Sequence, residues 1–186
     1  MDKTTKGVGA VIGSVVSAMT TAAAGWLVYS RVFVNHNVTL PPALGADREH
    51  FGGGYAGMLH YYADRSGDGT PLLLIHAVNA AASAYEVRPL FEHYRGQRPV
   101  YALELPGFGF SQRGDRPYTP RVFTNAIIGF LETQVEEPVD IVALSLSSEF
   151  AARAALERAQ NVRSLALISP TGLGKDAHER QPDEGL

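Results

Sequence analysis

Residues 139–149 read Val-Asp-Ile-Val-Ala-Leu-Ser-Leu-Ser-Ser-Glu, and this stretch decides the fold. An apolar run ends at Ser145, and an alanine-rich segment follows from about residue 147 to 160. The pattern is a relaxed form of G-x-S-x-G, with Ala143 and Ser147 where the two glycines are expected. It predicts a strand, a sharp turn that exposes the Ser145 hydroxyl at the end of a sheet, and then a helix. A serine presented in this way is a candidate nucleophile.

The sequence around this stretch alternates between predicted strands and predicted helices. We expect strands at 48–51, 57–64, 71–76, 99–104, 139–144 and 162–169, and helices near 84–94, 119–137 and 147–160. Thr119 and Pro120 mark a helix start, as N-cap and first helical residue. The short apolar run at 71–76 is typical of a central strand buried on both faces. Strands that alternate with helices of this length predict a three-layer α/β/α sandwich around a mostly parallel sheet.

Two further motifs lie at the carboxyl ends of predicted strands. The first is Leu-Ile-His-Ala-Val-Asn at 74–79, and the second is Leu-Glu-Leu-Pro-Gly-Phe-Gly-Phe-Ser at 103–111. Open α/β sheets bind their ligands beyond the carboxyl ends of the strands. We therefore expect both motifs to lie at the same edge of the sheet as Ser145.

Taken in order, the three motifs resemble the α/β-hydrolase superfamily, in the branch of esterases, haloperoxidase-like enzymes, epoxide hydrolases and carbon–carbon bond hydrolases. The resemblance covers residues 48–174 and implies the N-terminal portion of an α/β-hydrolase fold, which ends after the strand that follows the nucleophile helix. It implies that Ser145 attacks an ester or related acyl substrate, a small molecule, and forms an acyl-enzyme. The backbone N–H groups of Val78 and Leu146 would form the oxyanion hole. This chemistry needs no cofactor and no metal.

Several residues near the motifs receive structural interpretations. Ser147 and Ser148 are interpreted as caps of the helix that follows Ser145. His76 is structural in the family that the motifs resemble. Glu104 replaces the commoner aspartate of the Pro-Gly-x-Gly loop and is expected to brace that loop.

A serine hydroxyl needs a base to take its proton and a carboxylate to orient that base. In the α/β-hydrolase order, both follow the serine after further strands. Asp176, His178 and Glu179 have suitable side chains but follow the strand at 162–169 too closely. We therefore expect this chain to be the N-terminal part of a longer hydrolase, with the acid and histidine of the triad missing. The alternatives are a non-catalytic binding module that keeps the half-sheet, and an enzyme completed by a partner chain.

The N-terminus differs from the rest of the chain. Residues 7–30 carry no charge, and Lys3, Lys6 and Arg31 flank them. The stretch is long enough to span a bilayer, which takes about 20 residues, although small and hydroxyl side chains fill half of it. We expect membrane association through this anchor; a cleaved export signal and a helix on the surface of the domain are the alternatives.

The predicted domain organisation follows from these segments. Residues 1–34 form an apolar helix, 35–47 a linker, 48–174 the partial α/β-hydrolase domain and 175–186 a disordered tail.

The composition excludes several other functions. A formal net charge of −3 gives no basic footprint for nucleic acid. The absence of cysteine excludes disulfides, thiolate metal sites and a cysteine nucleophile. The remaining histidines lack the spacing of metal ligands; they are His36, His50, His60 and His93.

Overall fold

The computed structural model describes residues 4–34 and 40–171, and the chain divides into two compact units, Met1–Leu40 and Pro41–Leu186. The first unit contains one long helix, α1 (Thr4–Phe33). Among the described residues, no helix is both long and apolar enough to cross a membrane. Membrane association through the uncharged residues 7–30 stays a prediction.

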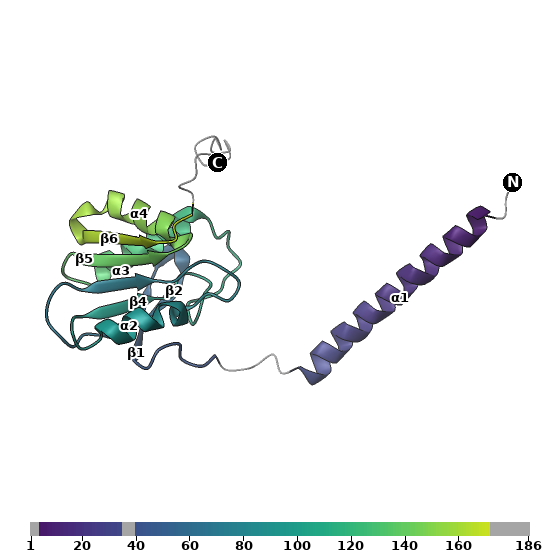
Figure 1. The fold of residues 1–186 in the computed structure, drawn as a ribbon, viewed down its shortest axis with the longest axis horizontal. Helices are drawn as coiled ribbons and strands as arrows, with labels where there is room; N and C mark the ends of the chain where they lie inside the picture. The colour runs from purple at the N-terminus through teal and green to yellow at the C-terminus, as the bar shows by residue number, and fades with distance from the viewer. Residues whose placement is uncertain (1–3, 35–39, 172–186) are drawn as a thin grey trace. The chain divides into compact units, whose positions relative to one another are not determined.

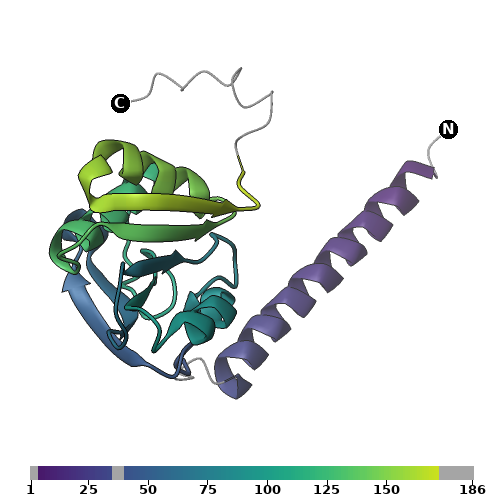
Figure 2. The ribbon, with the colours of Figure 1, turned by 60° about the vertical axis from the view of Figure 1, so that its left-hand side comes forward.

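The second unit is built on one six-stranded sheet (Figures 1 and 2). The strands lie in the order β1-β2-β4-β3-β5-β6, so that β1 and β6 form the two edges. The bounds are β1 (Asp47–Gly52), β2 (Met58–Asp64), β3 (Leu72–Ile75), β4 (Val100–Leu103), β5 (Val139–Leu144) and β6 (Val162–Ile168). Strands β4, β3, β5 and β6 are parallel, and β1 and β2 join as antiparallel strands. The predicted mostly parallel sheet is confirmed.

Two helical layers cover the opposite faces of this sheet, as predicted. One face packs against the short 3₁₀ turn η2 (Ala84–Val87) and helix α2 (Arg88–Tyr94) through an apolar cluster that includes Leu74 and Phe91. The other face packs against α3 (Pro120–Thr133) and α4 (Ser147–Glu157). Strands β3 and β4 are buried along their whole length, which explains their uninterrupted apolar sequences.

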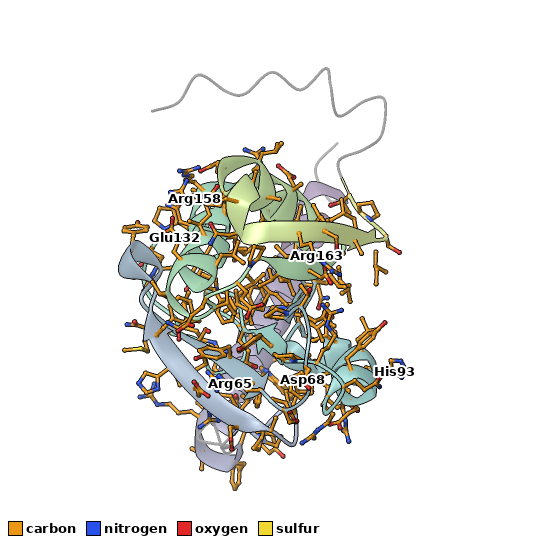
Figure 3. The ribbon with its side chains drawn as sticks, turned by 90° about the vertical axis from the view of Figure 1, so that its left-hand side faces the viewer. Arg65, Asp68, His93, Glu132, Arg158 and Arg163 are labelled. Atoms are coloured by element: carbon orange, nitrogen blue, oxygen red, sulfur yellow. The ribbon has the colours of Figure 1, made fainter. Side chains whose placement is uncertain are left out.

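The two helices on the second face hold one another through both apolar and charged contacts. The rings of Phe123 in α3 and Phe150 in α4 stack with centroids 4.9 Å apart. At the other end of α4, Arg158 donates to Glu132 of α3 with an N–O distance of 2.5 Å (Figure 3).

Two predicted helix ends are wrong. The predicted helix at 84–94 is helical throughout, but its first turn is a 3₁₀ helix and the α-helix starts at Arg88. Helix α3 ends at Thr133 and not at residue 137, because the chain turns before Pro138, whose ring disfavours helical backbone in the residue ahead of it. Helix α4 ends at Glu157, and a 3₁₀ turn over Ala159–Asn161 occupies the rest of the predicted segment.

Other predictions concern the ends of the sheet and of the chain. Thr119 is the N-cap residue of α3, but its side chain accepts no capping hydrogen bond. Strand β1 begins at Asp47, so the sheet includes the last residue of the predicted linker. The predicted tail at 175–186 and the linker residues 35–39 lie outside the described residues.

Candidate active site

Strands β3 and β5 are neighbours in the parallel part of the sheet, and the chain leaves them toward opposite faces. Helix α2 follows β3 on one face, whereas α4 follows β5 on the other. Open α/β sheets bind ligands at such a switch point, outside the carboxyl ends of the strands. The loop after β3 contains Val78, and the turn after β5 contains Ser145 and Leu146. The fold therefore brings all three sequence-predicted site residues to the carboxyl ends of two neighbouring parallel strands.

Ser145 lies in a strained backbone conformation. Its φ is +52°, and among the described residues only Ser169 shares a positive φ without being glycine. The left-handed region costs an L-residue about 1–2 kcal/mol. Hydrogen bonds on both sides of the turn hold it: Ser145 N–H donates to the Ile168 carbonyl at 2.9 Å, and the Ser145 carbonyl accepts from Ser148 N–H at 3.1 Å. The surrounding structure thus imposes the strain that the turn requires.

The two serines after Ser145 are not helix caps, contrary to the sequence interpretation. Leu146 is the N-cap residue of α4, without a side-chain capping bond. The buried Ser147 hydroxyl donates to the His76 carbonyl at 2.5 Å, and the Ser148 hydroxyl donates to the Ala143 carbonyl at 3.2 Å. Both hydroxyls satisfy buried carbonyl groups and so connect the start of α4 with the ends of β3 and β5.

The Ser145 side chain is different, because it has no hydrogen-bond partner among the residues that the structure describes. The residue is half-buried and lines an open cleft of about 600 Å³. Walls of this cleft include Ala77, Leu144 and Ile168. The hydroxyl is therefore available to a ligand in the cleft.

Val78 and Leu146 line a second cleft, on the side of α3 and α4. Within residues 40–171, neither of their N–H groups donates to a protein acceptor. The N–H of Leu146 also lies at the start of α4, where unpaired donors and the positive end of the helix dipole coincide. These are the properties that a site for a developing negative charge requires.

His76 is a structural residue, in agreement with the sequence interpretation. Its ring is fully buried, and burial lowers the pKa of its imidazole. Nδ1 lies 2.6 Å from the Ala77 carbonyl, and Nε2 accepts a hydrogen bond from Leu105 N–H at 3.1 Å. The neutral imidazole, with its proton on Nδ1, satisfies both partners and joins the loops after β3 and β4.

Glu104 braces the Pro-Gly-x-Gly loop, as expected from the sequence. Its Oε2 accepts from Phe110 N–H at 2.7 Å, while Oε1 is buried without a partner. Burial raises the pKa of this carboxyl group above its usual value. Gly109 has a φ of +50° and lies so close that a Cβ atom there would be 1.9 Å from Oε1. The loop therefore requires glycine at this position.

Sequence reasoning missed Glu86, which holds the loop after β3. Its two carboxylate oxygens accept from Ala77 N–H at 2.8 Å and from the Asn79 side-chain amide at 2.9 Å. The residue lies in the first turn of η2, and it also lines the cleft beside Ser145. An acidic residue at a helix start was the available signal, but such residues usually serve the helix itself.

The remaining candidates do not form a further site in the described part of the chain. Asp176, His178, Glu179 and His36 lie outside it. Within it, no group of three or more histidine, aspartate or glutamate residues could hold a metal ion.

Comparisons with known proteins concern the family and the fold of the chain. The sequence profile of the alpha/beta hydrolase family matches residues 72–185. The dihydrolipoyllysine-residue acetyltransferase component of an acetoin cleaving system from Cupriavidus necator is 30% identical over 115 residues, which are 61% of this chain and 30% of that protein.

Among solved structures, a probable hydrolytic enzyme from Pseudomonas aeruginosa is 18% identical with a TM-score of 0.62, over 75% of this chain and 46% of that one. A serine hydrolase involved in carbazole degradation is 22% identical with a TM-score of 0.59, over 70% and 50%. Both likenesses show the fold. A meta-cleavage product hydrolase from Pseudomonas fluorescens is 27% identical with a TM-score of 0.56, over 63% and 43%. This chain thus spans half or less of each of these relatives.

Proposed function

The chain belongs to the alpha/beta hydrolase family, and on that premise we propose that Ser145 is the nucleophile of a serine hydrolase. The observation that carries the proposal is the strained turn between β5 and α4, which holds Ser145 at a φ of +52° and leaves its side chain in a cleft without a partner among the described residues. Observed strain of this kind clusters at functional sites. The substrate class that we propose is an ester or related small acyl compound.

In the proposed reaction, Ser145 Oγ attacks the substrate carbonyl carbon, and the carbonyl oxygen becomes an oxyanion. The N–H groups of Val78 and Leu146 donate to this oxygen, and such a donor is worth about 3 kcal/mol by mutational precedent. Collapse of the tetrahedral intermediate expels the alcohol or other leaving group and leaves the acyl group on Oγ. Water then releases the acid and restores the serine.

The Ser145 proton must pass to a base before the leaving group departs. No base is hydrogen bonded to Ser145 within residues 4–34 and 40–171. His76 does not serve, since both ring nitrogens hold loop backbone. We therefore propose that the base lies outside the described residues, in this chain or in another.

Labelling with a fluorophosphonate probe, followed by peptide mapping, tests the proposal. We expect modification of Ser145 in the wild-type chain and none in Ser145→Ala. Ser169→Ala is the matched control, because Ser169 also has a positive φ and lines the same cleft; it should label like the wild type. Equal labelling of the wild type and Ser145→Ala contradicts the proposal and, in a well-folded chain, supports the non-catalytic binding module. An unlabelled wild type would place the base in another chain, because a serine without a base reacts poorly with the probe.

A further inference from the structure

The second cleft has walls made of aromatic rings. It has a volume of about 600 Å³, within the usual range for small-molecule sites. Phe123 and Phe150 line it, and their rings stack with an interplanar angle of 12°. The rings of Phe108 and Tyr118 flank Phe123, with centroids 6.5 Å and 6.2 Å away. Such walls offer a flat apolar group both ring faces and ring edges.

The cleft adjoins the atoms that would polarise a substrate. Val78 and Leu146, whose N–H groups form the proposed oxyanion hole, both line it. A substrate whose carbonyl oxygen accepts from these groups therefore places one of its substituents against the rings. This step rests on the proposed function, whereas occupancy of the cleft by a ligand does not.

Two charged residues line the cleft, and only one of them has an ion-pair partner. Glu149 accepts from Arg153 at 2.7 Å, so its charge is already balanced. Arg113 Nη1 donates to the Gly109 carbonyl at 3.0 Å, and within residues 40–171 Arg113 forms no ion pair.

Glu104 compensates the charge of Arg113 only weakly. Glu104 interacts with Arg113 electrostatically, but burial favours the neutral form of this carboxyl group by raising its pKa. Oε2 of Glu104 is also committed to Phe110 N–H. Arg113 is exposed, and its guanidinium group adds a positive charge without an ion-pair partner, among the described residues, to a cleft whose lining is mainly apolar and aromatic.

We propose that this cleft binds an aromatic group that carries a carboxylate, with the ring against Phe108 and Phe123 and the carboxylate on Arg113. A guanidinium group presents a planar fork of donors that matches a carboxylate. For the proposed hydrolase, the substrate class is then an acyl compound with an anionic aromatic substituent.

Ligand-detected NMR titration of the 186-residue chain tests this site with three probes. They are 3-phenylpropanoate, the neutral isostere 3-phenylpropanamide, and propanoate, which lacks the ring. We expect 3-phenylpropanoate to bind most tightly, by about fivefold over the amide, as for one partly exposed ion pair. Equal affinity for the carboxylate and the amide overturns the charge assignment. If propanoate binds as tightly as 3-phenylpropanoate, the assignment of the cleft to an aromatic ring is overturned.

Two variants locate the carboxylate contact. Arg113→Gln should abolish the preference for the carboxylate and leave amide binding unchanged. Arg116→Gln is the matched control, because Arg116 is a neighbouring arginine that binds the Tyr55 carbonyl and does not line the cleft. Equal losses in the two variants would overturn the assignment to Arg113. Thermal unfolding of Arg113→Gln at the wild-type temperature verifies that the variant is folded.

Ser145→Ala separates this site from the reaction. It should bind 3-phenylpropanoate like the wild type, because Ser145 is not among the residues that line the aromatic cleft. A chain that binds the probe but resists the fluorophosphonate retains the aromatic site and loses the serine mechanism. A chain that labels at Ser145 but shows no carboxylate preference retains the mechanism and loses the proposed carboxylate contact at Arg113.

Discussion

Polar groups at the amino ends of the parallel strands have different surroundings from polar groups at the carboxyl ends; these two ends are called the amino edge and the carboxyl edge below. At the amino edge, Asp140 accepts from Arg98 at 2.6 Å, from Arg163 at 2.8 Å and from Ser164 at 2.6 Å. At the carboxyl edge, one oxygen of buried Glu104 has no partner, and Ser145 is strained. Figure 3 shows Arg163 of the amino-edge cluster on β6. The amino edge is thus arranged for stability, whereas the carboxyl edge leaves groups available to a ligand.

The pKa values of the two buried carboxyl groups express this difference. Hydrogen bonds from Arg163 lower the pKa of Asp140 far below its usual value, so this group remains charged. Burial raises the pKa of Glu104, which favours its neutral form. The two ends of the strands thus favour opposite protonation states, because hydrogen bonds from guanidinium groups outweigh burial at Asp140, whereas burial dominates at Glu104.

The largest loss of stability is expected from Gly109→Ala at the carboxyl edge. A Cβ there would meet Glu104 Oε1 at 1.9 Å, and a φ of +50° disfavours alanine. We expect a loss of about 3 kcal/mol in the free energy of unfolding, measured by urea titration. Gly52→Ala is the control, since nothing lies within 4 Å of its Cβ position. Equal losses in the two variants would contradict the close packing of this loop.

Asp140→Asn tests the amino edge and should lower the free energy of unfolding by about 2 kcal/mol, because it leaves two arginines without their carboxylate. The lowered pKa also fixes the pH dependence. The stabilisation is complete above the unfolded-state pKa of about 4 and is lost as the pH falls below it. The variant should therefore have a shallower acid transition. Asp68→Asn, at an exposed position, is the control; a similar change there would contradict the role of Asp140.

Glu104→Gln should show the opposite pH trend. A raised pKa in the folded state means that this group stabilises most at acid pH and that its contribution is lost as the pH rises through the folded value. Relative to the wild type, the glutamine variant should therefore gain in the free energy of unfolding between pH 5 and pH 8. Denaturant titrations at both pH values, with exposed Glu136→Gln as control, measure this gain. A relative loss would mean that Glu104 is charged in the folded protein.

The sequence was sufficient to predict the sheet and the position of Ser145 in the turn between β5 and α4. Apolar runs at β3, β4 and β5 are local signals of buried parallel strands, and β5 was predicted at its observed bounds. The helix ends were less predictable. Hydroxyl side chains near a helix start suggest caps, but Ser147 and Ser148 lie beside buried carbonyl groups that belong to distant strands.

Contacts between distant segments account for what the sequence could not reveal. Glu86 reaches back to the loop after β3, and Asp140 joins Arg98 and Arg163 from two other strand starts. The aromatic cleft combines residues from three separate segments, and Arg113 is notable there only because its neighbours are known. No local pattern predicts such combinations, since each of these charged residues, taken alone, resembles an ordinary surface residue.

The central claim is that the strained turn at Ser145 serves to present the serine hydroxyl to a ligand. The free energy of unfolding of Ser145→Gly, measured together with fluorophosphonate labelling, tests it most directly. Glycine adopts a φ of +52° without strain, so the variant should gain about 1 kcal/mol in stability while it loses all labelling. Ser169→Gly should gain stability in the same way and keep its labelling, because its φ is +49° but its hydroxyl has no proposed role. A Ser145→Gly chain that is less stable than the wild type, or that still reacts with the probe, would contradict the claim.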